Sequence, residues 1–351
     1  MSYKTFFIGA LCSILSVILI LGSIMIIVDP FFHYHAPLDG FEYQIHNQRY
    51  QNDGILRNFE YDSVIIGTSM TENFSASLWD ELFDAKTVKV SLSGSFLKES
   101  AERLERAFAS NDQIKYVVRS LDFYSLNVSK DLISEYNYPS YLYDDNIFND
   151  VKYIFNKSVW ANEVLPVFYN TKHNIKTPNF DEAYRWADDF VYGKQAVLER
   201  YNRSDKLETL SADISDLKQG IRENLEQNVI SFARDFKQTE FYLFFPPYSI
   251  VVWDNWQRQG VLEQNIEIMR YVSELLLEYE NIHLFSLNDN FSLICDLNNY
   301  KDFEHYGDWI NVKILENMKS GEGLITLENC NTHYDSLLNF YSSYNYDEIF
   351  E

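Results

Sequence analysis

Three residues at opposite ends of the chain have the types and the order of a hydrolytic triad. Ser69 follows the apolar run Val-Ile-Ile at 64–66, and Asp302 and His305 lie together near the other end. The three-residue step lets the last two side chains share one face of a turn, so the aspartate can orient the imidazole. The imidazole can then take the serine proton. The pattern predicts attack by the Ser69 hydroxyl on an ester carbonyl.

Each half of this pattern also has a purely structural interpretation. Gly67 lets the chain turn sharply out of a strand, and Ser69 then lies where a helix begins and can cap it. Asp-x-x-His, in turn, is common in surface turns. The two halves together, in this order, favour the catalytic interpretation. In that case the N–H groups at the helix start would hold the oxyanion.

Short apolar runs predict the strands that position these residues. Each run is rich in β-branched or aromatic residues and is followed by small or polar ones, as buried parallel strands are. The runs are 63–67, 87–92, 115–121, 240–245 and 281–287. Helical periodicity over 96–109 and 261–279 fills two of the intervals. The alternation predicts an α/β fold with a doubly wound, mainly parallel sheet and functional loops at the carboxyl ends of its strands.

The N-terminus has the length and composition of a transmembrane helix. Residues 6–28 carry no charge, and at about 1.5 Å per residue they can cross a hydrocarbon core of about 30 Å. Lys4 precedes the run and Asp29 follows it, which predicts a cytoplasmic N-terminus and an extracytoplasmic remainder. A cleaved signal peptide is the alternative, but the run is long for one and no Ala-x-Ala site follows. We expect an uncleaved, single-pass anchor at 1–28 in a cell membrane.

Composition narrows the classes of partner and cofactor. The 351 residues are 46% hydrophobic, enough for one large core or for one core plus an insertion. The net charge of −23 argues against a nucleic-acid partner. No phosphate loop, dinucleotide fingerprint or zinc spacing occurs, so neither cofactor nor metal is expected. His33 and His35 lack a third ligand at metal spacing. Cys295 and Cys330 lie outside the anchor, and whether they pair is left open.

Four segments make up the expected domain organisation. The anchor is followed by a juxtamembrane segment at 29–60 and by the α/β domain at 61–325. The stretch at about 127–238 is too long for a loop and predicts a largely helical insertion that forms a cap or side wall. Residues 326–351 are an acidic, aromatic tail that either packs on the domain or is partly disordered.

These motifs give the chain a resemblance to the SGNH/GDSL hydrolase superfamily, which has a flavodoxin-like three-layer fold. It looks most like a membrane-anchored branch associated with bacterial cell-surface polysaccharides. The resemblance covers nearly the whole soluble part. The segments that carry it are Val-Asp-Pro-Phe at 28–31, Gly-Thr-Ser at 67–69, Phe-Phe-Pro-Pro-Tyr-Ser at 244–249, Asp-x-x-His at 302–305 and His-Tyr-Gly-Asp-Trp-Ile-Asn at 305–311. Distant relatives include the D-alanine-transfer protein of teichoic acid modification and the acetyltransferases of exopolysaccharide export.

The resemblance implies Ser69 as nucleophile, His305 as base and Asp302 as its orienter. Thr68 stands where the family usually has aspartate. Gly94, in Ser-Leu-Ser-Gly-Ser, matches the glycine of the second motif, so the N–H groups of Ser69 and Gly94 are expected to hold the oxyanion.

The third family motif departs further. Its usual Asn is replaced by Asp122, and a carboxylate donates no hydrogen bond to an oxyanion unless it is protonated. Asp122 is therefore assigned to binding a hydroxyl of the acceptor. Tyr248 lies in the rim after the fourth strand, where it either contacts the substrate or, as such loops favour, has a structural role.

The expected function is that of an extracytoplasmic serine esterase or O-acyltransferase, acting on a cell-surface glycan through a Ser69 acyl-enzyme. The partners implied are the glycan or its acyl donor and an integral-membrane acyltransferase. One alternative is a non-catalytic glycan-binding or assembly protein that keeps the fold. Another is a lipid esterase, which would have an apolar trough beside Ser69. The sequence leaves the acyl group, the glycan and the direction of transfer open.

Overall fold

The computed structural model describes residues 2–136, 138–205 and 212–351. Its sheet has six strands in the order β2-β1-β3-β4-β5-β6. The strands are β1 (Ser63–Ile66), β2 (Thr87–Lys89), β3 (Tyr116–Ser120), β4 (Glu240–Phe245), β5 (Ile282–Ser286) and β6 (Leu324–Ile325). The first five pair in parallel, and β6 pairs antiparallel with β5. The α/β class and the mainly parallel sheet are thus confirmed.

All five predicted strands occur within their expected ranges; β4 fills its range, and the other four are shorter. The side chains of β1 are fully buried, as expected for a central strand of a parallel sheet. The sixth strand was not predicted, because the two residues of β6 are too few to form a periodic pattern.

The chain divides into two compact units. Unit 1 comprises residues 1–60 and 136–179, and unit 2 comprises 61–135 and 180–351. All strands lie in unit 2. The stretch that was expected to form a single insertion at 127–238 is therefore divided between the units. Residues 136–179 belong with the N-terminal segment, and residues 127–135 and 180–238 belong with the sheet.

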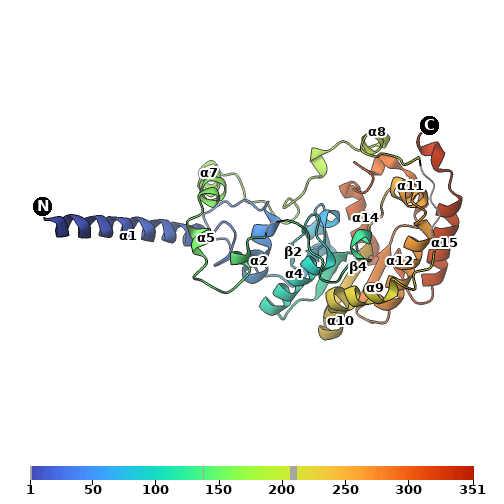
Figure 1. Cartoon of the computed structure of the whole chain (residues 1–351), viewed down its shortest axis with the longest axis horizontal. Coiled ribbons are helices and arrows are strands. Elements are labelled where there is room, and N and C mark those ends of the chain that lie inside the picture. The colour runs from blue at the N-terminus through green and yellow to red at the C-terminus, as the bar shows by residue number, and fades with distance from the viewer. Residues whose placement is uncertain (1, 137, 206–211) are drawn as a thin grey trace. The chain divides into compact units, whose positions relative to one another are not determined.

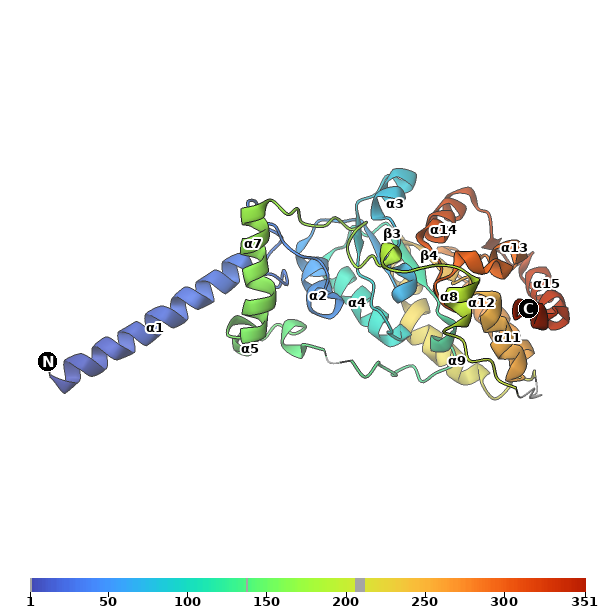
Figure 2. The same ribbon diagram turned by 90° about the horizontal axis from the view of Figure 1, so that it is seen from above.

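Helices fill the connections of unit 2. The two that were predicted are α4 (Leu97–Ser110) and α12 (Leu262–Leu276), and each buries one apolar face. The other α-helices are α3 (Ala76–Phe83), α8 (Lys194–Leu198), α9 (Lys218–Leu225), α10 (Ser231–Asp235), α11 (Ile250–Arg258), α13 (Phe291–Cys295), α14 (Asp308–Ser320) and α15 (Cys330–Ser343) (Figures 1 and 2). Short 3-10 or π segments are η1 (Ser69–Thr71), η2 (Phe123–Ser125), η5 (Ala187–Asp189), η6 (Glu226–Ile230), η7 (Leu297–Asn299) and η8 (Tyr346–Ile349).

The C-terminal segment packs on the rest of unit 2. The ring of Tyr341 on α15 stacks on Trp253 with centroids 3.6 Å apart, and the hydroxyls of Tyr334 and Ser273 are 2.6 Å apart. Of the two expectations for 326–351, the described structure shows packing. Cys295 and Cys330 are free thiols.

Unit 1 begins with α1 (Tyr3–Val28), the one helix in the described chain that is long and apolar enough to cross a membrane. An aromatic core follows it, in which Phe31 stacks on Tyr153 with centroids 5.4 Å apart. The remaining elements of unit 1 are α2 (Gln48–Asn58), η3 (Ser140–Leu142), α5 (Val151–Ile154), α6 (Lys157–Val159), η4 (Trp160–Val164) and α7 (Leu165–His173).

The carboxyl end of α1 belongs to the core of unit 1. Met25 and Val28 are buried, and so is Asp29, which ends the helix in a left-handed conformation. The Asp29 carboxylate accepts hydrogen bonds from the Tyr153 hydroxyl at 2.8 Å and from the backbone N–H of Tyr34 at 2.7 Å. The helix therefore continues into a packed structure without a flexible linker.

His33 and His35, which follow α1, have protein partners in unit 1. His33 Nε2 lies 3.5 Å from the Asp150 carboxylate, and His35 Nε2 lies 2.8 Å from the backbone oxygen of Ile26. These contacts give His33 and His35 a structural role, because they join the end of α1 to the residues around it.

Candidate active site

The three residues of the predicted triad lie together in unit 2. The Ser69 Oγ is 2.8 Å from His305 Nε2, and His305 Nδ1 is 3.0 Å from each carboxylate oxygen of Asp302. A tautomer with its proton on Nδ1 donates to Asp302 and leaves Nε2 to accept from Ser69. This is the relative arrangement of a nucleophile, a base and the group that orients the base.

A sharp turn after β1 places Ser69. Gly67 has a φ of +152°, and a Cβ there would lie 2.8 Å from Thr71 Cγ2 and even closer to the Ser120 hydroxyl. Thr68 caps η1, because its Oγ1 accepts a hydrogen bond from the backbone N–H of Met70 at 3.3 Å. The capping role that was the alternative for Ser69 thus belongs to Thr68, and the Ser69 hydroxyl is left to contact His305.

Backbone hydrogen bonds fix the other half of the site. Asp302 Oδ1 accepts from the N–H of Glu304 at 2.9 Å and from the N–H of His305 at 2.8 Å. Burial acts to raise the pKa of Asp302, but the hydrogen bond and charge of His305, with these two N–H groups, lower that pKa to about 2. Asp302 is therefore ionised over the whole range in which a neutral histidine could act as a base.

Ser69 and Asp122 follow neighbouring parallel strands, β1 and β3, at the same edge of the sheet. The strand order reverses here, since β2 lies on one side of β1 and β3 on the other. Such a reversal leaves a crevice at the carboxyl ends of the strands, which is where open α/β sheets bind ligands.

Asp122 is 1% exposed and lies beneath the turn that carries Ser69, to which it is hydrogen-bonded. Its carboxylate accepts hydrogen bonds from Thr68 Oγ1 at 2.9 Å, Ser120 Oγ at 2.7 Å and the Tyr248 hydroxyl at 3.3 Å. Burial raises the pKa of Asp122, against the effect of these three hydroxyls. Substrate binding by Asp122 and Tyr248 stays a prediction. Their burial and mutual contact favour a role in positioning the turn that carries Ser69.

The loop that carries Gly94 runs beside the same turn. The backbone N–H of Leu92 donates to the oxygen of Gly67 at 2.8 Å, and Gly94 follows two residues later, exposed and with a φ of +66°. An oxyanion donor, together with the N–H of Ser69, is the role expected for the N–H of Gly94. That role stays a prediction for both groups.

An aromatic and cationic cluster beside the triad was not predicted. The Trp186 ring meets His305 edge-on, with centroids 5.6 Å apart. Lys301 Nζ lies 3.8 Å from the ring centroids of both Trp186 and Phe190, and 4.0 Å from an oxygen of Asp302. These contacts restrict the imidazole and its aspartate. Trp186 lies in a polar stretch far from His305 in sequence, so no local pattern indicates its place.

Lys89 is buried next to the nucleophile turn. Its ammonium donates to the backbone oxygens of Glu72 at 2.6 Å, Phe74 at 3.0 Å and Asp181 at 3.3 Å. Burial lowers the pKa of Lys89 to about 7. The lysine joins the segment after Ser69 to the segment that leads to Trp186.

We expect the free energy of unfolding to rise between pH 7 and 10 by about 3 kcal/mol more in the wild-type chain than in a Lys89→Met variant. In this window the unfolded chain binds a proton at Lys89 that the folded chain has released, so raising the pH favours the folded state. Denaturant unfolding of both full-length chains in one detergent measures the effect. An exposed-site control, Lys115→Met, should follow the wild type, and a Lys89→Met difference that is constant with pH would contradict the prediction.

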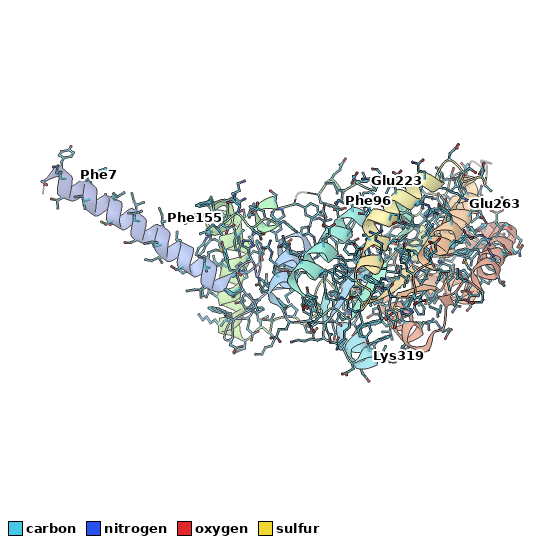
Figure 3. The ribbon with its side chains drawn as sticks, turned by 90° about the horizontal axis from the view of Figure 1, so that it is seen from below. Phe7, Phe96, Phe155, Glu223, Glu263 and Lys319 are labelled. Atoms are coloured by element: carbon cyan, nitrogen blue, oxygen red, sulfur yellow. The ribbon has the colours of Figure 1, made fainter. Side chains whose placement is uncertain are left out.

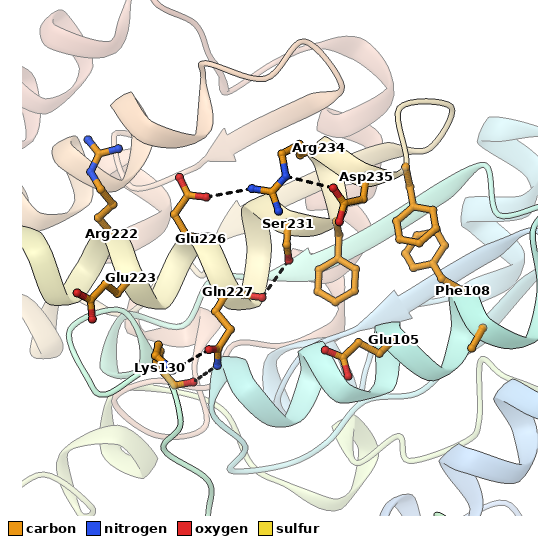
Figure 4. A pocket seen from close by; sticks show the side chains of 13 residues that line it. Glu105, Phe108, Lys130, Arg222, Glu223, Glu226, Gln227, Ser231, Arg234 and Asp235 are labelled. Atoms are coloured by element: carbon orange, nitrogen blue, oxygen red, sulfur yellow. Dashed lines mark hydrogen bonds and ion pairs between the residues drawn. The ribbon is translucent and has the colours of Figure 1, made fainter.

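A second concave feature of unit 2 lies away from the triad. It is a groove of about 860 Å³ between α4 and the α9–α10 segment (Figure 4). Its apolar floor includes Phe108 and Phe236, whose rings stack with centroids 3.8 Å apart. The Ser231 hydroxyl donates to the backbone oxygen of Gln227, and Arg234 pairs with Glu226. The residues that line this groove therefore offer no nucleophile paired with a base.

No family model matches this chain, and no curated protein matches it either. Among solved structures, a chain from Streptococcus pneumonia that is provisionally described as a platelet activating factor covers 78% of this chain and 91% of its own length. The identity is 12% and the TM-score is 0.41. At that TM-score the likeness carries no argument about fold or activity.

Proposed function

We propose that the chain is a membrane-anchored member of the SGNH/GDSL hydrolase superfamily and acts as an extracytoplasmic serine esterase or O-acyltransferase. The observation that carries this proposal is the hydrogen-bonded series Ser69–His305–Asp302, with contacts of 2.8 and 3.0 Å. The strand order β2-β1-β3-β4-β5 supports a doubly wound, flavodoxin-like sheet. A nucleophile directly after β1 and an Asp-x-x-His motif beyond β5 agree with the same superfamily.

In the proposed reaction His305 Nε2 takes the hydroxyl proton as Ser69 Oγ bonds to the acyl carbon of the donor ester. The oxyanion is held by the N–H groups of Ser69 and Gly94. The bond from the acyl carbon to the donor oxygen then breaks, and that oxygen leaves with the proton from His305. Water or a glycan hydroxyl attacks the acyl-enzyme in the second step, again with His305 as base, and restores Ser69.

The proposed site of action is the outer face of a cell membrane, on esters of a surface glycan. The buried end of α1 supports an uncleaved anchor, because cleavage after Val28 would remove Met25 and Val28 from the core of unit 1. The glycan and an integral-membrane acyltransferase partner rest on the family resemblance.

A non-catalytic glycan-binding protein is the second candidate. One observation favours it: Asp122, at the place of the family's third oxyanion donor, accepts three hydrogen bonds in the interior. With Asp122 ionised, the oxyanion hole of this chain would contain backbone donors alone.

Labelling with a fluorophosphonate probe tests the enzyme against this rival. We expect the full-length chain in detergent to be labelled at Ser69, because an activated serine attacks the phosphorus atom. Ser69→Ala and His305→Ala variants should not be labelled. An exposed-serine control, Ser292→Ala, should be labelled as the wild type is. A folded wild-type chain that takes no label would contradict the proposal and favour the binding protein.

A further inference from the structure

Helix α7 of unit 1 exposes an apolar face. Leu165, Phe168 and Tyr169 are 58%, 41% and 58% exposed, and their spacing places them on one side of the helix. The opposite side is buried through Val167 and Asn170. A helix on a soluble protein normally turns its apolar side inward, so this face requires an apolar surface to cover it.

A second group of exposed apolar side chains lies around α5 in the same unit. Its members are Ile147, Phe148, Val151 and Phe155, of which Phe148 is 84% exposed. Figures 1 and 2 show α5 and α7 at the carboxyl end of α1, with α7 running across the axis of α1. Phe155 lies at that end of α1 in Figure 3, and Phe7 lies near the other.

The contact between α5 and α1 determines the level along α1 at which α5 lies. Ile154 Cγ2 lies 3.8 Å from the place of a Cβ on Gly22. At about 1.5 Å per residue the stretch from Tyr3 to Gly22 already measures about 30 Å, the thickness of a hydrocarbon core. If α1 crosses a membrane, α5 therefore lies at the outer boundary of the lipid.

The distribution of charge in unit 1 agrees with a position of α5 at the outer boundary of the lipid. Unit 1 carries seven Lys and Arg against nine Asp and Glu, so only two of the 23 excess negative charges belong to it. Residues 144–176, which contain these apolar side chains, have four lysines and four carboxylates. Of the carboxylates, Asp150 and Glu163 are buried, and Asp145 pairs with Arg57 at 3.1 Å. Apolar and aromatic side chains flanked by lysines are the composition of a surface that contacts lipid headgroups.

We propose that the α5–α7 face, defined as Ile147, Phe148, Val151, Phe155, Leu165, Phe168 and Tyr169, lies in the outer boundary of the bilayer that α1 crosses. The occupant of this face is lipid. The apolar side chains enter the upper acyl region, and Lys152, Lys157 and Lys172 meet headgroup phosphates. The α5–α7 face is then a second membrane contact of unit 1, in addition to α1.

The test uses the full-length chain in vesicles of three parts phosphatidylcholine to one part phosphatidylglycerol, with a lipid that carries a diazirine in its acyl chain. After illumination, mass spectrometry maps the lipid adducts. We expect adducts in α1 and also within residues 147–175. Adducts in α1 show that the helix is in the membrane, whether or not the α5–α7 face also contacts lipid. The experiment therefore distinguishes a chain that is not anchored from an anchored chain whose α5–α7 face does not contact lipid.

A paired substitution gives the control. Phe148→Asp with Leu165→Asp should lower the adduct yield within 147–175 about fivefold and leave the α1 adducts unchanged, since charges near the membrane boundary oppose insertion. Leu327→Asp, at a 66% exposed leucine of unit 2, should change neither. Adducts confined to α1 would overturn the proposal and point to a membrane protein as the occupant. Adducts within 147–175 that persist in the double variant would overturn the assignment of this face.

Discussion

An Asp302→Asn variant is expected to acylate Ser69 about 10,000-fold more slowly than the wild type, with its fold unchanged. The pKa of Asp302 is lowered to about 2, so the wild-type carboxylate is ionised at neutral pH and accepts the Nδ1 proton of His305. An asparagine amide can donate its own proton to Nδ1, which places the imidazole proton on Nε2. That tautomer cannot take the proton of Ser69.

The rate of fluorophosphonate labelling measures this loss. Asp308→Asn is the matched control, because Asp308 is a partly buried aspartate on α14 whose charge pairs with Arg185 at 2.6 Å. We expect its labelling rate to stay within a few-fold of the wild type, as loss of one partly exposed ion pair has a small effect. An Asp302→Asn rate within tenfold of the wild type would show that Asp302 does not orient a catalytic base.

The second large effect is expected from Gly67→Ala, which should lower the free energy of unfolding by about 3 kcal/mol or more and abolish labelling. An alanine here would be strained at a φ of +152°, and its methyl group would contact Thr71 Cγ2 at 2.8 Å and overlap the Ser120 hydroxyl. The turn would have to shift, and Ser69 would shift with it from His305. Denaturant unfolding and probe labelling report the two losses separately.

Gly321→Ala separates backbone strain from steric overlap. Gly321 has a φ of +82°, but a Cβ there meets nothing within 4 Å. We expect this variant to lose about 1 kcal/mol and to keep its labelling, since only the left-handed conformation opposes the substitution. Equal losses in the two variants would mean that crowding by Thr71 and Ser120 contributes little.

The sheet could be predicted because its strands are buried on both faces. Such strands are continuous apolar runs, and the runs at 63–67 and 240–245 need no tertiary information to be recognised. The triad was predictable for a related reason: Ser69 directly follows a strand, and Asp302 and His305 are close in sequence.

Features that depend on distant contacts could not be predicted. Tyr153 packs on Phe31 and bonds to Asp29, 124 residues away, and this contact assigns part of the expected insertion to unit 1. Trp186 reaches His305 in the same way. The capping role of Thr68 depends on one hydroxyl rotamer, which residue types alone do not determine.

The packed end of α1 has a consequence for preparing the protein without that helix. A truncated form that starts at Asp29 would lack Met25 and Val28, so apolar side chains such as Phe31 would be left partly uncovered. Its charged α-amino group would also lie on a buried aspartate that normally ends a helix. Aggregation of such a fragment would therefore reflect a damaged core and would say nothing about the stability of the intact chain.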